Sequence, residues 1–408
     1  MRVFSLVFCG LIFGCLAMAG CSQTGASSTM LPADRNAVSQ QRTSSSFTIL
    51  YSFKGGVDGA IPTAGLAALN GKLYGTTSRG GSPHSGLPRG TIFRINTGGL
   101  ERVIHRFNRV GVKNGADPQA QLTALDDALY GTTSSGGSQG LGTAFEMTTA
   151  GKERVLHSFG SYDKDGVNPT GGLLPLNGAF YGVTTFGGAA NEGTVFTLSA
   201  SGTERVLYSF KGGSDGDYPS GLAVLGGKLY GTTQQGGDAN CQCGVVFALS
   251  AAGKERVLYR FTGGQDGANP YAGPTEFNGA LYGTTNGGGN PNCSYGGGCG
   301  TVFKVTASGT ESILYAFDSS KRADGIFPQT ALTVAGGRLY GTTRSCNQWG
   351  YGTIFEVDAS GKERVLYTFT GGSDGAHPSS LTLLNGLFYG TTPIGGANNY
   401  GTVFALSP

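Results

Sequence analysis

Four acidic residues stand out because they do not recur in the otherwise similar segments of this chain. They are Glu192, Asp217, Asp238 and Glu276. A pair of carboxyl groups can cleave a glycosidic linkage, one as general acid and the other as base or nucleophile. Glu192, Asp238 and Glu276 are therefore the residues to watch for action on a polysaccharide. No serine, histidine and acid arrangement of a hydrolase triad stands out, so we favour a protein that is not an enzyme.

A second set of residues recurs along the chain, where an acidic or amide residue precedes glycine and a proline follows. The set is Asp58, Asn114, Asp165, Asp215, Asp266, Asp324 and Asp374. We interpret the segment as a turn in which the side chain accepts backbone N–H groups and glycine takes a positive φ. Calcium is the alternative, because oxygen-rich loops suit this cation; Asp163, Asp165 and Asn168 are its best candidates. The rest of a calcium loop pattern is missing there, so we expect no cofactor.

Aromatic and amide side chains gather in the glycine-rich loops that differ most along the chain. These residues are Asn240, Asn290, Asn292, Tyr295, Gln348, Trp349, Tyr351, Asn399 and Tyr400. Flat rings offer apolar area to a sugar face, and amides both donate to and accept from hydroxyls. Tyr295, Trp349, Tyr351, Asn399 and Tyr400 are therefore the candidate binding residues. The same side chains suit a protein partner, and ordinary polar loops would also contain them.

Five cysteines follow residue 46, all in these loops: Cys241, Cys243, Cys293, Cys299 and Cys346. Disulfides are the default in an exported protein. Cys293 and Cys299 form the easiest pair, and links between neighbouring repeats are the alternative. The odd number leaves one thiol over, and no matching histidine supports a zinc site.

The elements that must position these loops recur seven times. A Leu/Phe-Tyr-Gly tripeptide has its tyrosine at positions 74, 130, 181, 230, 282, 340 and 389, spaced by 49 to 58 residues. A period near fifty with several short strands per unit is typical of propeller blades. In one unit, residues 221–225 and 228–233 form a hairpin. Elsewhere its turn is Asn-Gly, which suits the two positive φ values of a type I′ turn.

Each unit continues with a third strand, such as residues 193–198, and a fourth, such as 205–210. Apolar residues on both faces of these strands indicate sheets packed on both sides. Charged sets such as 152–154 open the fourth strands and predict a solvated rim. Residues 47–53 supply a spare fourth strand, and the chain ends after a third strand at 401–406. We therefore predict an all-β, seven-bladed propeller over 47–408, with four antiparallel strands per blade, closed by pairing of these two segments.

The amino terminus predicts export. Residues 1–20 contain one basic residue followed by an apolar run of signal-peptide length. Residues 18–21 resemble a bacterial lipobox that ends in Cys21, which would be lipidated; plain secretion after a small-x-small site is the alternative. Residues 21–46 are rich in Ser, Thr and Gln and predict a flexible tether. We expect anchoring to the outer membrane or cell surface, with a secreted or periplasmic location as the alternative.

The composition of the chain limits the classes of partner that it can bind. Charged residues make up 13% of the chain and the net charge is +3, which is too small for a nucleic-acid footprint. Contact with a membrane is expected only through the lipid anchor. The 74 glycines, combined with 10% aromatic residues, indicate many tight turns around a packed core.

The repeated unit resembles a known family. Gly-Thr-Val-Phe, Ser-Gly-Lys-Glu-Arg-Val-Leu-Tyr-Ser-Phe, Gly-Gly-Ser-Asp-Gly and Leu-Tyr-Gly-Thr-Thr together resemble the bacterial GloVer tandem repeat, a "choice-of-anchor" extracellular repeat. The resemblance covers residues 47–408. It implies a surface or envelope protein and supplies neither catalytic residues nor a ligand.

These observations favour a surface or envelope propeller that binds a glycan or an envelope protein through one loop face. A polysaccharide-acting hydrolase or lyase and a structural envelope scaffold are the alternatives, because the fold alone does not determine function.

Overall fold

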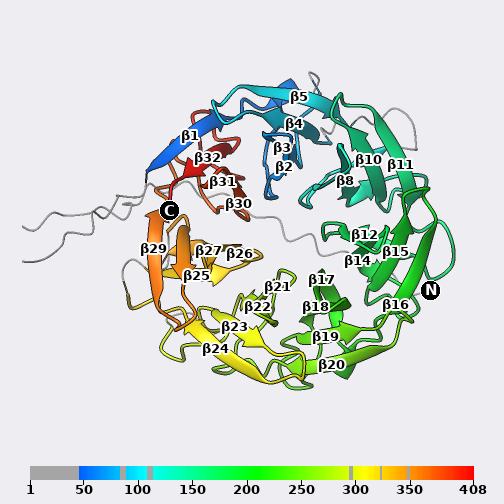
Figure 1. Cartoon of the computed structure of the whole chain (residues 1–408), viewed down its shortest axis with the longest axis vertical. Coiled ribbons are helices and arrows are strands. Elements are labelled where there is room, and N and C mark those ends of the chain that lie inside the picture. Colours follow the sequence, from blue (N-terminus) through cyan, green and yellow to red (C-terminus); the bar gives the residue numbers. More distant parts are fainter. Residues whose placement is uncertain (1–45, 83–88, 108–113, 294–296, 322–323, 347–349) are drawn as a thin grey trace, which may run out of the picture.

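The computed structural model describes residues 46–82, 89–107, 114–293, 297–321, 324–346 and 350–408. In these residues, seven sheets of four main strands stand around a central axis as the blades of a propeller (Figure 1). All main strand pairs are antiparallel, and no α-helix is present in the described residues. None of their helical turns could cross a membrane. The predicted fold class is confirmed.

Each blade runs from an innermost strand near the axis to an outermost strand at the rim. Blades 1 to 3 contain β2 (Ala67–Leu69), β3 (Lys72–Thr77), β4 (Thr91–Ile95) and β5 (Glu101–Arg106); β7 (Thr123–Leu125), β8 (Ala128–Thr133), β10 (Thr143–Thr148) and β11 (Glu153–Ser158); and β13 (Leu174–Leu176), β14 (Ala179–Gly187), β15 (Thr194–Ser199) and β16 (Glu204–Ser209). Blades 4 to 6 contain β17 (Asp217–Leu225), β18 (Lys228–Gln235), β19 (Val245–Leu249) and β20 (Glu255–Arg260); β21 (Thr275–Phe277), β22 (Ala280–Thr285), β23 (Thr301–Val305) and β24 (Glu311–Ala316); and β26 (Thr333–Ala335), β27 (Arg338–Cys346), β28 (Thr353–Val357) and β29 (Glu363–Thr368). The connections include β6 (Gly115–Ala116), β9 (Ser135–Gly136), β12 (Gly166–Pro169), β25 (Gly325–Pro328) and the 3-10 turns η1 (Gly56–Asp58) and η2 (Gly213–Asp215).

Blade 7 combines both ends of the described chain. It contains β30 (Thr382–Leu384), β31 (Leu387–Thr392), β32 (Thr402–Leu406) and β1 (Phe47–Ser52). β1 is antiparallel to β32, with Phe47 opposite Leu406 and Ser52 opposite Thr402. The Phe47 ring also stacks on Tyr367 of blade 6 with 3.7 Å between ring centroids. β1 therefore covers the edge that β32 would otherwise expose.

The hairpins between the first and second strands have the predicted turns. At the four Asn-Gly turns the asparagines have φ values of 49° to 52°, and each following glycine also has a positive φ. These are Asn70, Asn177, Asn278 and Asn385. Two consecutive positive φ values are the requirement of a type I′ turn, which matches the twist of the strands.

Inside every blade a phenylalanine of the third strand lies over a glycine of the second strand. Gly231, for example, is directly opposite Phe247, and a Cβ at Gly231 would lie 2.4 Å from Phe247 Cζ. In all seven repeats the corresponding distance is 2.3 to 2.7 Å. The pairs are Gly75–Phe93, Gly131–Phe145, Gly182–Phe196, Gly231–Phe247, Gly283–Phe303, Gly341–Phe355 and Gly390–Phe404. The glycine of Leu/Phe-Tyr-Gly is therefore required by the volume of a neighbouring ring.

The same phenylalanine joins neighbouring blades. Phe210, which follows the outermost strand of blade 3, packs edge to face against Phe247 of blade 4 with 5.2 Å between centroids. Phe261 and Phe303 repeat this contact between blades 4 and 5 at 5.1 Å. Edge-to-face pairs at this distance add to the free energy gained by burying the rings. The prediction that repeated aromatics fill the spaces between blades is confirmed.

The two threonines of Gly-Thr-Thr have separate structural roles. The second threonine lies 2.8 Å, hydroxyl to hydroxyl, from the threonine that opens the third strand, as in Thr77 with Thr91. The first threonine in several blades donates to a backbone carbonyl of the next blade, as Thr232 does to Ala272. These buried hydroxyls are thus hydrogen-bonded, except that of Thr76, which has no hydrogen-bond partner.

The contact between phenylalanine and glycine gives the first prediction. Gly231→Ala places a methyl group within the ring of Phe247, so we expect the free energy of unfolding to fall by about 1–3 kcal/mol, as in other overpacked cores. Urea unfolding measures the change. Gly98→Ala is the control, because its Cβ would meet only Asn96 Oδ1 at 3.5 Å. Equal stability of the two variants would contradict this account.

Candidate functional site

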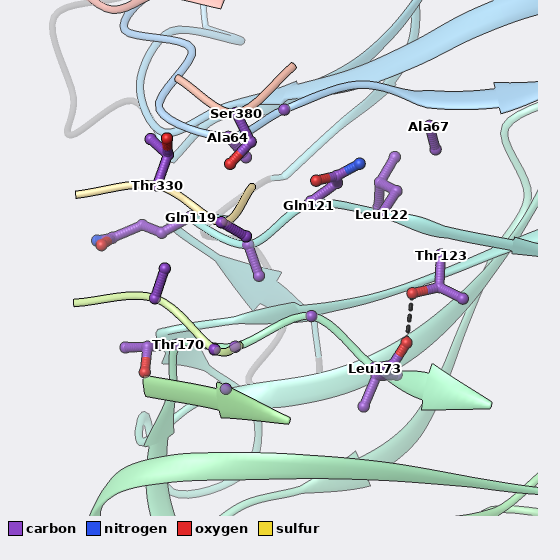
Figure 2. Close-up of a pocket in the computed structure, with 18 of the residues that line it drawn as sticks. Ala64, Ala67, Gln119, Gln121, Leu122, Thr123, Thr170, Leu173, Thr330 and Ser380 are labelled. Carbon is purple, nitrogen blue, oxygen red and sulfur yellow. Dashed lines mark hydrogen bonds between the residues drawn. The ribbon is translucent and has the colours of Figure 1, made fainter. Parts of the chain in front are cut away.

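The main cavity of the described residues lies at the propeller axis and has a volume of about 620 Å³. All seven blades contribute the segment at or just before the innermost strand. These segments are residues 63–68, 119–124, 170–174, 220–222, 271–274 and 329–331, with Ser380 and Thr382. Figure 2 shows Gln119, Thr170 and Thr330 around one part of the cavity and Leu122 and Leu173 around another.

No residue that lines this axial channel carries a formal charge. Its polar groups are amides and hydroxyls, notably Gln119, Gln121, Gln329, Thr170 and Ser220. Gln121 donates to the Leu66 carbonyl at 2.7 Å, which holds its amide against blade 1. Tyr271 is the aromatic residue of the lining and is 43% exposed. The channel can therefore offer hydrogen bonds and one exposed ring, without charge.

Two smaller cavities, of about 310 and 320 Å³, adjoin the channel beside blades 6 and 7. The first shares Thr63 and Gln329 with the channel, and both are lined by Arg344 and His377. The Arg344 side chain is exposed, and His377 Nδ1 lies 2.7 Å from the Arg344 carbonyl oxygen. Burial lowers the pKa of His377, so its imidazole is neutral at pH 7. Arg344 brings a positive charge to this side of the channel mouth.

Seven residues occupy the same position in the connections that lead to the innermost strands, and their side chains differ from blade to blade. Each member precedes the proline of the connection between blades: Ile61, Asp117, Asn168, Tyr218, Asn269, Phe327 and His377. All seven have φ between 55° and 60°, a left-handed conformation that is uncommon outside glycine. We call these residues the pre-proline ring. The backbone is the same in every blade, whereas the side chains are apolar, acidic, amide or aromatic.

A hydrogen bond between blades holds this unusual backbone. The N–H of each ring residue donates to a carbonyl of the preceding blade at 2.7 to 3.2 Å, for example Asn269 to Cys243 and His377 to Tyr351. The following proline packs on a glycine of that blade, where a Cβ at Gly244 would lie 2.8 Å from Pro270 Cδ. The backbone is thus fixed by packing and the side chains are left to vary. The sequence analysis did not predict this ring. The signal that could have indicated it is the residue before each repeated proline, which differs among the seven repeats.

The four non-repeated acids do not converge. Asp217 immediately precedes ring residue Tyr218, and the backbone N–H of Tyr218 donates to the Glu192 carbonyl at 3.2 Å. Burial and the nearby charge of Glu192 raise the pKa of Asp217 to about 6. Asp238 accepts from the N–H of Asn240 within its own turn. Glu276, in β21, accepts from the N–H of Gly279 in a hairpin turn, at the opposite end of the strands. None of the four lines the three cavities.

Three of the predicted binding residues, Tyr351, Asn399 and Tyr400, lie in described loops that precede third strands. Tyr351 packs its ring on Gly371 and Tyr400 packs its ring on Gly55, in each case on the turn that follows the outermost strand of the same blade. Asn399 Oδ1 accepts from the N–H of Gly395 at 3.0 Å, which stabilises its own loop. Tyr295 and Trp349 lie outside the described residues, as does Cys21.

The recurring aspartates form the predicted turns. Asp215, for instance, accepts from the N–H of Lys211 at 2.8 Å, and Asp266 accepts from the N–H of Thr262 at 2.7 Å. Among the calcium candidates, Asp165 is buried and accepts from the N–H groups of Ser161 and Gly166. Asp163 is exposed, and Asn168 belongs to the pre-proline ring.

Two disulfides lie in the loops of blades 4 and 5. Cys293 is joined to Cys299, and Cys241 to Cys243. Cys346 is buried in blade 6. The links are local to each loop, so they fix loop shape without joining blades.

The sequence pattern that defines the Gloeobacter/Verrucomicrobia repeat matches residues 12–243 and 225–408. The chain belongs to this family. The match confirms the resemblance that the repeated motifs indicate. No match is found among curated proteins.

Solved structures resemble this repeat protein in fold. A puromycin-hydrolyzing peptidase of Mycobacterium tuberculosis aligns with a TM-score of 0.50 and 11% identity, over 83% of this chain and 51% of the peptidase. This chain thus spans about half of the peptidase chain. A putative gluconolactonase aligns with a TM-score of 0.38 and 12% identity, over 65% of this chain and 80% of its own. At 11% identity the likeness to the peptidase concerns the fold alone.

At the rim of this repeat protein, a tyrosine, an aspartate and a glutamate meet between blades. The tyrosine hydroxyl donates to the aspartate at 2.7 to 3.1 Å in five blades, as in Tyr259 with Asp266. The glutamate comes from the charged set that opens the next outermost strand. Its lysine and arginine neighbours are exposed, but the glutamate is half-buried. The prediction of a wholly solvated rim was therefore wrong for this residue, because its side chain turns into the space between blades.

Burial and the facing aspartate change the acidity of these glutamates. The pKa of Glu311 rises to about 7, first because it is buried and second because Asp266 is charged. Glu101, Glu255 and Glu363 behave in the same way, with pKa values of about 7. An unfolded glutamate has a pKa of 4.5. Between these two values the folded state binds more protons than the unfolded state, so stability falls as pH rises.

This linkage gives the second prediction. We expect the free energy of unfolding to decrease from about pH 4.5 to about pH 7 and then to level off. Glu311→Gln cannot ionise, so its decrease should be smaller than that of the parent protein. Urea unfolding at several pH values between 4.5 and 8 measures both curves. Parallel curves for parent and variant would show that Glu311 does not contribute.

Proposed function

We propose that this repeat protein is a glycan-binding propeller of the bacterial surface or envelope, whose ligand enters the axial channel from the loop face. The observation that carries the proposal is the lining of the channel. It combines amides, hydroxyls and one exposed tyrosine in a volume of about 620 Å³, without a formal charge. This volume falls within the range of about 300–1,000 Å³ that small-ligand pockets usually have.

The chemistry of the lining favours sugars over other partners. Nucleic acid requires several Lys or Arg contacts to phosphates, and the channel offers none. A sugar hydroxyl both donates and accepts, as do the amides of Gln119 and Gln329. The exposed ring of Tyr271 offers apolar area to the face of a sugar ring. The outer candidates Tyr295, Trp349, Tyr351, Asn399 and Tyr400 would extend such a site along the loop face.

The mouth would supply selectivity. Side chains of the pre-proline ring differ from blade to blade on a constant backbone, so contacts around the channel are asymmetric. Arg344 would favour a ligand with an acidic group on the side of blades 6 and 7. An envelope protein that presents a loop to the same face is the alternative partner.

The location is part of the proposal. A lipid on Cys21 would hold the protein at the outer membrane or cell surface, and residues 21–46 would give the propeller reach. Secretion or a periplasmic location without lipid would leave the binding face unchanged.

Glycan binding is tested with the exported chain from residue 22 onward, applied to an array of bacterial and plant glycans. We expect selective retention, and about tenfold weaker affinity for Tyr271→Ala, equivalent to about 1.4 kcal/mol. The double variant Gln119→Ala/Gln329→Ala should lose more, because two hydrogen-bonding groups are removed. Leu100→Ala is the control, since Leu100 is 76% exposed and does not line the channel. Retention that ignores all channel variants would place the ligand elsewhere.

Polysaccharide cleavage is the second candidate, and one observation favours it. Glu192 and Asp217 lie close enough for the charge of Glu192 to help raise the pKa of Asp217 to about 6. A carboxyl group that holds its proton near neutral pH can act as a general acid beside an ionised partner. The pair borders the pre-proline ring at Tyr218.

Cleavage is tested by incubating the retained glycans and analysing the solution for products. Activity should fall at least a hundredfold in Asp217→Asn, which cannot donate a proton, while glycan retention persists. Asp238→Asn is the matched control, because Asp238 interacts within its own turn. Absence of products from every retained glycan would remove this candidate.

A further inference from the structure

The space between blades 2 and 3 departs from the other spaces at the rim. In the outermost strand of blade 2, His157 stands where other blades have tyrosine, as at Tyr208 and Tyr259. His157 Nε2 lies 3.1 Å from Asp165 Oδ2 and 3.9 Å from Glu204 Oε2. One ligand atom from each of the three residues lies within 4.8 Å of the other two. An imidazole and two carboxylates thus meet across the interface.

Burial makes this cluster unlike a surface ion pair. The side chains of His157, Asp165 and Glu204 are 11%, 0% and 1% exposed. Glu204 Oε2 accepts from the Tyr162 hydroxyl at 2.6 Å, but Glu204 Oε1 is buried without a hydrogen-bond partner. A buried carboxylate that is not fully paired is costly, and a cation bound to the same carboxylate would offset that cost.

The equivalent positions of the other blades lack part of this cluster. The equivalent glutamate oxygen also lacks a partner at Glu255 and Glu311, but the neighbouring residue there is tyrosine, which is not a comparable metal ligand. His105 is a second histidine at this position and lies 3.4 Å from Glu153. Its repeat has Asn114 in place of the aspartate, so the second carboxylate is missing. Within the described residues, His, Asp and Glu come together only between blades 2 and 3.

We propose that His157, Asp165 and Glu204 bind a divalent transition-metal ion, with Zn²⁺ as the ion that fits best. A nitrogen and two carboxylate oxygens are an established donor type for Zn²⁺. Bonds of about 2.0–2.1 Å in a tetrahedral site separate ligand atoms by about 3.3 Å, and the distances of 3.1 and 3.9 Å bracket this value. Ser161 Oγ donates to Asp165 Oδ2 at 3.3 Å and stands beside the cluster.

The ion would have a structural role. His157 and Asp165 belong to blade 2 and to the connection that follows it, whereas Glu204 opens the outermost strand of blade 3. Coordination through Glu204 would therefore tie two blades together. The metal site lies at the outermost strands, whereas the axial channel lies at the innermost strands. Metal binding is therefore proposed independently of glycan binding.

The test measures Zn²⁺ bound to the exported chain without a histidine tag, by titration calorimetry and by metal analysis after dialysis. We expect one Zn²⁺ per chain and a thermal midpoint that rises by several degrees with Zn²⁺ and returns with a chelator. His157→Tyr installs the residue that other blades carry at this place, so it should fold and lose at least tenfold in Zn²⁺ affinity. Glu204→Gln, which keeps the shape and removes the charge, should also weaken binding.

Two matched controls complete the design. His105→Tyr makes the same change between blades 1 and 2 and should leave Zn²⁺ binding intact. Asp163→Ala removes an exposed carboxylate close in sequence and should also have no effect. Unchanged Zn²⁺ affinity in His157→Tyr, or no bound Zn²⁺ in the parent protein, would overturn the proposal and leave the cluster as a hydrogen-bonded interface.

Discussion

The structure depends on a phenylalanine ring that lies over a glycine of the neighbouring strand in every blade. The ring fills the volume that a side chain at the glycine would occupy, and its edge meets a phenylalanine of the preceding blade. One residue therefore sets the packing within a blade and between blades. Because close-packed interiors tolerate little change in volume, this contact accounts for the constant glycine of Leu/Phe-Tyr-Gly and the constant phenylalanine of the third strand.

Packing between blades also decides where variation is permitted. The pre-proline N–H, the proline ring and the facing glycine repeat seven times, so the backbone at the channel mouth is held in one conformation. Strained backbone that surrounding structure over-determines is typical of functional sites. The side chains of the pre-proline ring make no contact that recurs in every blade, and they differ from blade to blade. The rigid scaffold thus carries an asymmetric loop face.

Charged groups lie at the rim of the propeller and not at its axis. The axial channel has no charged lining, whereas acidic groups lie between the blades at the rim. Half-buried glutamates there have raised pKa values, first because they are buried and second because they face aspartates that the turns already hold. The replacement of tyrosine by His157 changes one such interface from a hydrogen-bonded acid pair into a set of potential metal ligands. Small changes in a repeated unit can therefore create a local site without altering the fold.

The sequence by itself determined the blades, their four strands, the type I′ turns and the aspartate turns, because these depend on neighbours within one repeat. Residues such as Asn70 and Asp215 take their roles from the next few residues of the chain. Only the tertiary structure decided which side chains meet across blades. Glu311 turns inward towards Asp266, and His157 meets Glu204, in each case across the space between two blades. These contacts, like the uncharged channel, depend on the angle and spacing between sheets, and no local pattern of residues encodes that geometry.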